Sequence, residues 1–294
     1  MTQDTATAAD PDLFGAALWM LGAVVSFSTM AVAGREVFKE LDVYQLMFYR
    51  SAISFSLVLM FAAFSKGGLG QFHSRRIGLH IVRNMFHLVG QFGWFFALAL
   101  IPLAQLFALE FTTPLWIAAL APLLLGERLS KMRLAAIAMG FVGVLVVLRP
   151  GLVEISLGAI VMLIGAMGFA GSLMATKRLT VTERPLTVIF YMALIQTPVG
   201  LLLAINNLNW PSLVTGLWLI LVAILGFTAH FCIVRAFSLA DAIVVAPLDF
   251  LRLPIIAVVG ILMYGEPLEL WVFAGGALIL LGNYGNLLVE RRKP

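Results

Sequence analysis

The sequence predicts an all-α integral membrane protein whose ten transmembrane helices form two inverted five-helix repeats. Three observations predict this fold class: an apolar composition, ten apolar runs long enough to cross a bilayer, and an internal duplication. Of the 294 residues, 62% are hydrophobic and only 12% are charged, whereas about 25% are charged in soluble domains. A chain with so much apolar surface requires lipid as its solvent.

Ten candidate spans follow from the length of the apolar runs. A helix needs about 20 mostly apolar residues to cross a hydrocarbon core of about 30 Å. The polar start of the chain lacks the basic residues of a signal peptide, so we expect the first span to be retained. The runs are continuous and lack the alternation of a β-barrel wall. The expected spans are residues 13–34, 43–65, 77–99, 103–125, 132–149, 156–176, 186–205, 212–236, 242–263 and 268–288.

The basic residues predict the orientation of these spans. If both termini are cytoplasmic, most Lys and Arg residues lie in the inner connections and tails, and only Arg35, Lys39 and Arg149 lie outside. This asymmetry follows the positive-inside rule. It accounts for the net charge of +4 without nucleic acid as a partner. We therefore expect a multi-pass protein of the cell membrane, plasma or inner.

The two halves of the chain resemble each other. "GAALWMLGAVVSFSTMAVAGREVFKE" from Gly15 matches "GAIVMLIGAMGFAGSLMATKRLTVTE" from Gly158, and "EFTTPLWIAALAPLLLGERL" from Glu110 matches "DFLRLPIIAVVGILMYGEPL" from Asp249. Because each half has five spans, the halves must lie in opposite orientations. Inverted repeats recur in secondary transporters, which bind substrate near the midplane. The predicted organisation is a cytoplasmic tail (1–12), two repeats (13–149 and 156–288) and a basic cytoplasmic tail (289–294).

A specific family resemblance rests on these features. The ten spans, the duplication and the patterns Pro114…Gly126–Glu127 and Pro254…Gly265–Glu266 resemble the drug/metabolite transporter superfamily and its EamA-type family. "AFSLADAIVVAPLDFLRLP" and "LGERLS" are also typical of that group. The resemblance covers about residues 13 to 288. It implies that spans 3, 4, 8 and 9 line a central cavity and that spans 5 and 10 are peripheral. It leaves the substrate open among amino acids, vitamins, nucleotide-like compounds and drugs.

Charged residues inside the spans are the first candidates for a substrate cavity, because charge within a membrane is costly. Asp249 and Arg252 are spaced i, i+3 and share a helical face; they form either a structural ion pair or a wall of the cavity. Glu110 has no partner on its own helix. It either pairs with Arg50 or Arg83, faces water, or stays protonated, which would suit proton coupling. Arg50 and Arg83 could instead snorkel to the membrane surface.

Polar residues on the third span extend the candidate cavity. His87, Gln91 and Trp94 continue a stripe that starts at Arg83, and such a stripe should face a cavity. Trp94 could also be an interfacial anchor. His230 on the eighth span is either a hydrogen-bonded packing residue or a cavity residue.

Three glycine-containing motifs have structural interpretations. Gly126–Glu127 and Gly265–Glu266 are expected to end helices and fix loops. The glycines from Gly165 to Gly171 are expected to form a helix-packing face.

Several function classes lack support in the sequence. There is no ATP-binding loop, and no grouping of ligands indicates a metal or a cofactor. The protein is therefore expected to be a secondary active transporter rather than an enzyme, with a small metabolite, the lipid bilayer and either a coupling proton or a counter-substrate as its partners. An amino-acid-like exporter is the first expectation for function. The alternatives are an uptake permease for a vitamin or nucleotide-like compound, a membrane-embedded enzyme, and a channel-forming or structural protein.

Overall fold

The computed structural model describes residues 12–65, 67–125, 130–179, 181–240 and 248–291. Within these residues every regular element is a helix, apart from one isolated bridge between Pro150 and Val153. The expected all-α class is therefore confirmed. The α-helices are α1 (Leu13–Val37), α2 (Val43–Phe64), α3 (Ile77–Leu100), α4 (Leu103–Glu110), α5 (Thr113–Leu125), α6 (Lys131–Leu148), α7 (Leu157–Leu179), α8 (Pro185–Ala204), α9 (Leu213–Leu239), α11 (Arg252–Tyr264) and α12 (Leu270–Arg291), and the short 3-10 helices are η1 (Gly68–Phe72) and η2 (Ile205–Asn207).

Eight helical segments of the described chain are long and apolar enough to cross a membrane, and α4 with α5 counts as one of them. The shorter α11 and the more polar α3 occupy the two remaining expected spans. Local sequence explains several helix ends. Asp42 and Gln45 form a capping box at the start of α2, and Ser212 caps α9. Gly265 ends α11 with a φ of 63°, a conformation that favours glycine.

The expected span over residues 103–125 is interrupted between α4 and α5, just before Pro114, one of the prolines in the expected spans that can kink a helix. Pro114 has no N–H, so it cannot donate to the Glu110 carbonyl four residues before it. The Thr113 hydroxyl donates to that carbonyl instead, at 2.8 Å. The Thr112 hydroxyl likewise donates to the carbonyl of Leu109, at 2.6 Å. The threonines therefore satisfy the backbone carbonyls at the break.

A second break lies at the corresponding place in the other half. Residues 241–247 of the expected span 242–263 lie outside the described residues. Asp249 is helical, Phe250 and Leu251 form a turn, and α11 starts at Arg252. The ring centres of Phe111 and Phe250 lie 4.2 Å apart. The two helix breaks are therefore in contact through these rings.

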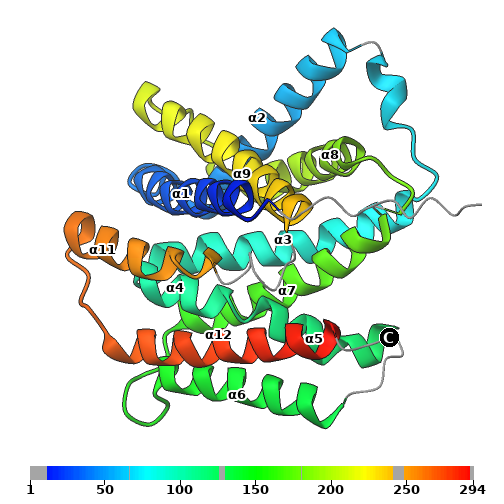
Figure 1. The fold of residues 1–294 in the computed structure, drawn as a ribbon. Coiled ribbons are helices and arrows are strands. Elements are labelled where there is room, and N and C mark those ends of the chain that lie inside the picture. Colours follow the sequence, from blue (N-terminus) through cyan, green and yellow to red (C-terminus); the bar gives the residue numbers. More distant parts are fainter. Residues whose placement is uncertain (1–11, 66, 126–129, 180, 241–247, 292–294) are drawn as a thin grey trace, which may run out of the picture.

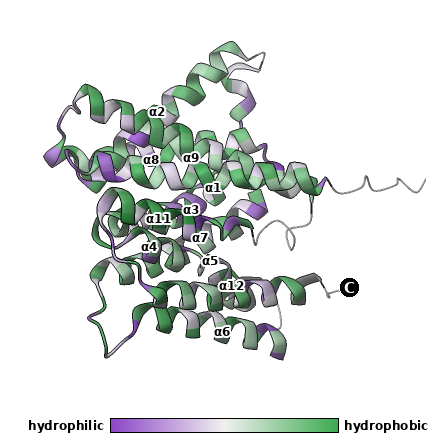
Figure 2. Ribbon diagram, turned by 60° about the vertical axis from the view of Figure 1, so that its left-hand side comes forward, coloured by the Kyte–Doolittle hydropathy of each residue, from purple (hydrophilic) through white to green (hydrophobic). Residues whose placement is uncertain are grey.

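The helices pack mainly in pairs: α3 with α7, α1 with α9, α6 with α12, and α2 with α8. Less extensive contacts join α4 to both α11 and α7. Figure 1 shows α3 and α7 in the middle, and α6 with α12 along one edge. Figure 2 shows the same order from a second direction, with apolar residues over most helix surfaces.

Glycines let α3 and α7 approach closely. A β-carbon on Gly93 would lie 2.8 Å from the Cα atom of Gly165, and one on Gly168 would lie 2.6 Å from the backbone nitrogen of Gly90. The packing face expected for the glycines from Gly165 to Gly171 is thus confirmed.

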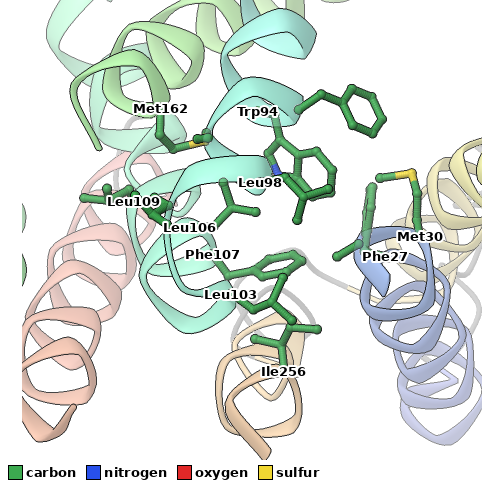
Figure 3. Close-up of a cluster of buried hydrophobic side chains, with 14 of the residues drawn as sticks. Phe27, Met30, Trp94, Leu98, Leu103, Leu106, Phe107, Leu109, Met162 and Ile256 are labelled. Atoms are coloured by element: carbon green, nitrogen blue, oxygen red, sulfur yellow. The ribbon is translucent and has the colours of Figure 1, made fainter. Parts of the chain in front are cut away.

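The hydrophobic core gathers where α1, α3, α4, α7 and α11 converge. Figure 3 shows Trp94 of α3 and Phe107 of α4 in this cluster, with Phe27 of α1 facing them. Leu106 and Ile256 are fully buried beside these rings. The same rings form one wall of the candidate site, so the site is built into the core.

Candidate functional site

Glu110, Asp249 and Arg252 form a charged cluster, the central triad, beside the two helix breaks. Arg252 Nη2 donates to Asp249 Oδ2 at 2.8 Å, and its Nη1 lies 3.4 Å from Glu110 Oε1. Trp94 Nε1 donates to the other oxygen of Glu110 at 2.7 Å. The Arg252 side chain is only 3% exposed, whereas those of Glu110 and Asp249 are 17% and 21% exposed. The cation of the triad is therefore the most enclosed group, although Asp249 Oδ1 is itself buried and has no hydrogen-bond partner among the described residues.

Three aromatic rings enclose the cation of the triad. The guanidinium carbon of Arg252 lies 4.7 Å from the ring centre of Phe27, 4.8 Å from that of Phe107 and 4.9 Å from that of Phe111. Each distance is within the range of cation–π attraction. Aromatic faces and two carboxylates thus hold Arg252 in one place.

The triad confirms one predicted pair and corrects two expectations. Asp249 and Arg252 pair as their spacing predicts. Glu110 pairs with neither Arg50 nor Arg83, because the breaks bring α4 against α11 and place Arg252 beside it. Trp94 is buried and bonded to Glu110, so its interpretation as an interfacial anchor is wrong.

A second group of polar side chains, the amide cluster, joins α2, α3 and α8. Arg50 Nη2 donates to Gln91 Oε1 at 2.7 Å and to Gln196 Oε1 at 3.3 Å. The amide nitrogen of Gln196 donates to Asn84 Oδ1 at 3.2 Å and lies 2.9 Å from Nδ1 of His87. These five side chains are all buried. They form a continuous hydrogen-bonded network inside an apolar bundle.

Arg83 extends the amide cluster toward α7. Its Nε donates to Thr176 Oγ1 at 3.2 Å, and its Nη1 donates to Asn84 Oδ1 at 3.1 Å. Both Arg50 and Arg83 are buried, so the interpretation that they snorkel is wrong. No carboxylate among the described residues forms an ion pair with either guanidinium. The described side chains that are hydrogen-bonded to these two guanidinium groups are all neutral.

His230 of α9 is the remaining candidate site residue. Its Nδ1 lies 2.8 Å from the Gly226 carbonyl oxygen of its own helix, and its ring packs edge-on against Phe27 at 5.5 Å. It interacts electrostatically with Arg50 and Arg252. Although it lies among these groups, His230 is exposed. Its direct contact with the triad's surroundings is the packing against Phe27.

The sequence analysis missed several members of this site. Asn84 and Gln196 are amides within apolar spans, and the argument used for intramembrane charges would have found them had it been applied to amides. The three phenylalanines around Arg252 could not be singled out in the sequence, because phenylalanine is common in any membrane helix.

The loop that follows α11 is held at the far end of the bundle. Arg35 forms an ion pair with Glu266 and donates to the carbonyl of Ile101 at 2.6 Å. Glu266 accepts from the backbone N–H of Leu103 at 2.9 Å. The loop-fixing role expected for Gly265–Glu266 is confirmed.

Two further observations concern possible ligands near this loop and elsewhere. A pocket of about 500 Å³ adjoins the loop, but the Arg35 and Glu266 groups at its edge are already paired. Gly126–Glu127, the counterpart of Gly265–Glu266, lies outside the described residues. Among the described residues, no group of three or more His, Cys, Asp or Glu side chains could hold a metal ion.

Comparison with known proteins points to one family. The EamA-like transporter family matches residues 14–149 and again residues 156–288. The chain is 31% identical to the riboflavin transporter of Rhizobium johnstonii, over 95% of this chain and 93% of the relative. It is 25% identical to the S-adenosylmethionine uptake transporter of Rickettsia bellii, over 93% and 94%. It is also 25% identical to the pseudopaline exporter CntI of Pseudomonas aeruginosa, over 87% and 90%.

A solved crystal structure shares the fold. The TM-score is 0.63, with 20% sequence identity over 95% of this chain and 99% of that one. This likeness concerns the arrangement of the helices alone. The family and the named relatives are transporters, not enzymes.

Proposed function

The chain belongs to the EamA-like transporter family, and we propose that it is a secondary active transporter that moves a small polar or amphipathic metabolite by alternating access. The observation that carries this proposal is the pair of polar clusters buried at the centre of an apolar bundle. Polar groups cost free energy in a membrane, so those that are retained usually serve a substrate or ion pathway. A central position between two halves is also where secondary transporters bind substrate.

Helix packing supports an inverted repeat as the basis of alternating access. In the proposed repeat, α1, α2, α3, α5 and α6 correspond to α7, α8, α9, α11 and α12, and α5 aligns with α11 at the same offset that pairs Glu110 with Asp249. Exchanging counterparts turns the α1–α9 pair into the α7–α3 pair, and it leaves the α2–α8 and α6–α12 pairs unchanged. Such a pattern is expected if two copies of one unit pack about a two-fold axis.

Contacts between α6 and α12 support the same symmetry at atomic detail. A β-carbon on Gly143 would lie 2.6 Å from the Gly275 carbonyl oxygen, and one on Gly282 would lie 2.7 Å from the Ala136 carbonyl oxygen. Gly143 and Ala136 correspond to Gly282 and Gly275 at one constant offset in sequence. Each contact is therefore the image of the other.

The distribution of Lys and Arg supports both termini in the cytoplasm and a location in the cell membrane. With that orientation, the connections α1–α2, α8–α9 and α11–α12 face outward, and the connections α2–α3 and α7–α8 face inward.

The relatives favour one of the two expected substrate classes. Two of the three relatives are named as transporters of riboflavin and of S-adenosylmethionine. They support uptake of a vitamin or nucleotide-like compound ahead of the amino-acid-like exporter. The relative named as a pseudopaline exporter supports export as the second candidate.

Charge distribution narrows the chemistry that the site can recognise. The amide cluster offers Arg50 and Arg83 without a described counter-ion, whereas the triad sets two carboxylates against one guanidinium. A substrate with an anionic or strongly hydrogen-bond-accepting group toward α2 and α3, and with a donor or cationic group toward α4 and α11, would match both clusters.

Counterflow into proteoliposomes tests the proposal directly. Riboflavin, S-adenosylmethionine and the common amino acids form the panel, and at least one should exchange. Arg50→Gln should reduce that exchange about tenfold or more, since a charge-assisted hydrogen bond is worth about 1.5–3 kcal/mol. Lys39→Gln is the matched control, because Lys39 is 68% exposed in an outer connection. Absence of any counterflow would refute the transporter proposal, and an unaffected Arg50→Gln variant would refute the substrate site alone.

Proton coupling is tested separately at Glu110. Glu110→Gln removes the charge while it keeps the shape, so it should flatten the pH dependence of exchange if this carboxylate carries the coupling proton. A pH profile that is unchanged from wild type would leave Glu110 with a structural role.

A further inference from the structure

Two glutamates occupy equivalent positions in the two halves of the chain. Glu40 lies in the connection after α1, and Glu183 lies in the connection after α7, which is the counterpart of α1. The repeat alignment from Gly15 and Gly158 pairs these two residues directly. In the proposed topology Glu40 faces the outside and Glu183 faces the cytoplasm.

Glu40 is bonded to the start of α9, in the other half of the chain. Its Oε1 accepts from the backbone N–H of Ser212 at 2.7 Å, and its Oε2 accepts from the Ser212 hydroxyl at 2.6 Å and from the Thr215 hydroxyl. Ser212 is the N-cap residue of α9. A carboxylate at this position also faces the positive end of the helix dipole. The hydrogen bonds from Ser212 and Thr215 lower the pKa of Glu40.

Glu183 makes the corresponding contact at the opposite end of the bundle. Its Oε1 accepts from the hydroxyl of Ser74 at 2.6 Å. The same hydroxyl accepts from the backbone N–H of Arg76 at 3.0 Å, and α3 begins at Ile77. Because α3 is the counterpart of α9, this contact lies at the corresponding helix start, although Ser74 is two residues before the N-cap residue Arg76 and Ser212 is itself the N-cap.

The two contacts differ in strength. Among the described residues, Glu40 accepts three hydrogen bonds from Ser212 and Thr215, whereas Glu183 accepts one, from Ser74. Neighbouring contacts add to the outer side. Tyr49 Oη donates to the Asn209 carbonyl at 2.6 Å, and the Gln45 side chain donates to the Asn207 carbonyl. On the inner side, Arg76 donates to the Arg178 carbonyl at 3.2 Å and the Thr187 hydroxyl donates to the Gln71 carbonyl at 3.4 Å. The difference between the two faces therefore lies in the contacts of the two glutamates themselves.

We propose that Glu40 and Glu183 are a matched pair of positioning residues, one at each face of the membrane, which fasten the first connection of each half to the third helix of the other half. The inference rests on the proposed alternating-access function. Each contact joins the two halves, so each must loosen when the halves move apart at its own face. The stronger Glu40 contact keeps the outer face closed at rest and sets the balance between the two states.

Distance measurements between spin labels test this inference without any substrate. Outer labels at Lys39 and Leu213 and inner labels at Val181 and Ile77 use exposed positions. They are introduced into a Cys232→Ser background, because Cys232 is the one cysteine of the chain. In Glu40→Gln we expect the outer distance to lengthen and the inner distance to shorten. The population of this state should rise about tenfold, the scale of losing one or two exposed hydrogen bonds.

Three variants test whether Glu40 holds the two halves together or only caps α9. Glu183→Gln should move the two distances in the opposite directions and by less. Thr215→Val, which removes one hydrogen bond, should lie between wild type and Glu40→Gln. Glu154→Gln changes another exposed carboxylate on the outer face and should change neither distance.

Two results would overturn the inference. Outer movement without inner movement would make Glu40 a local cap, and unchanged distances in Glu40→Gln would show that it does not hold the outer face. Both results leave the transporter proposal standing, because counterflow tests that proposal independently.

Discussion

Replacing Arg252 with methionine should destabilise the protein more than any change to an exposed charge. The substitution keeps an unbranched side chain but removes the guanidinium that bonds Glu110 and Asp249. Removing one partner of a buried ion pair costs about 3–5 kcal/mol, because it leaves an uncompensated charge. Glu110 and Asp249 are 17% and 21% exposed, so partial hydration favours the lower end, about 3 kcal/mol. Loss of the cation–π contacts adds about 1 kcal/mol.

The measurement is reversible unfolding in mixed detergent micelles, followed by tryptophan fluorescence. Lys39→Met is the matched control: its ion pair with Glu36 is largely exposed, so the cost should be about 0–1 kcal/mol. A triple variant that combines Arg252→Met with Glu110→Gln and Asp249→Asn should recover most of the loss, because no charge then stays unpaired. The reasoning fails if Arg252→Met costs less than about 1 kcal/mol, or if the triple variant is no more stable than the single one.

Three further changes test other parts of the structure in the same unfolding assay. Gly168→Ala should lower the free energy of unfolding by about 1–3 kcal/mol, because its β-carbon would clash with the backbone of α3. Gly216→Ala, which has open space around it, is the control and should not lower it. Equal effects of the two changes would contradict the packing argument. Gln196→Leu should lower the free energy of unfolding by about 2–3 kcal/mol, because three buried polar groups lose a hydrogen-bond partner. Thr197→Val is the control and should lower it by less than about 1 kcal/mol, because the Thr197 hydroxyl donates to a carbonyl of its own helix. The pKa of Glu40 is lowered from 4.5, so its stabilisation should be complete above pH 4.5 and disappear as the pH falls through the lowered value. The stability difference between wild type and Glu40→Gln should therefore shrink at low pH, and a constant difference would contradict this assignment.

The helical class could be predicted because lipid imposes a simple rule. A backbone in hydrocarbon must satisfy its own hydrogen bonds, so each apolar run of sufficient length becomes a helix. This rule does not predict the break between α4 and α5, although the sequence shows that Pro114 lacks an N–H. Whether a proline bends, breaks or leaves a helix straight depends on whether other groups satisfy the freed carbonyl. Here the Thr113 hydroxyl does so.

Individual site residues were more predictable than their partners. Arg50, Arg83, Glu110, Asp249 and Arg252 were all visible as polar groups in apolar runs. Their cost in lipid does not depend on the rest of the fold. Partner choice does depend on it, because hydrogen bonds and ion pairs act only over a few ångströms.

By itself the sequence determined that the chain is helical and membrane-embedded, that its halves are related, and which buried charges require an explanation. These properties follow from local composition and from repetition along the chain. Only the tertiary structure decided that Arg252 serves both carboxylates within an aromatic cage, and that neutral side chains hold Arg50 and Arg83. Glu40 and Glu183 also reach the starts of α9 and α3 only in the folded bundle. Such short-range contacts join residues far apart in sequence, so they exist only once the helices have packed.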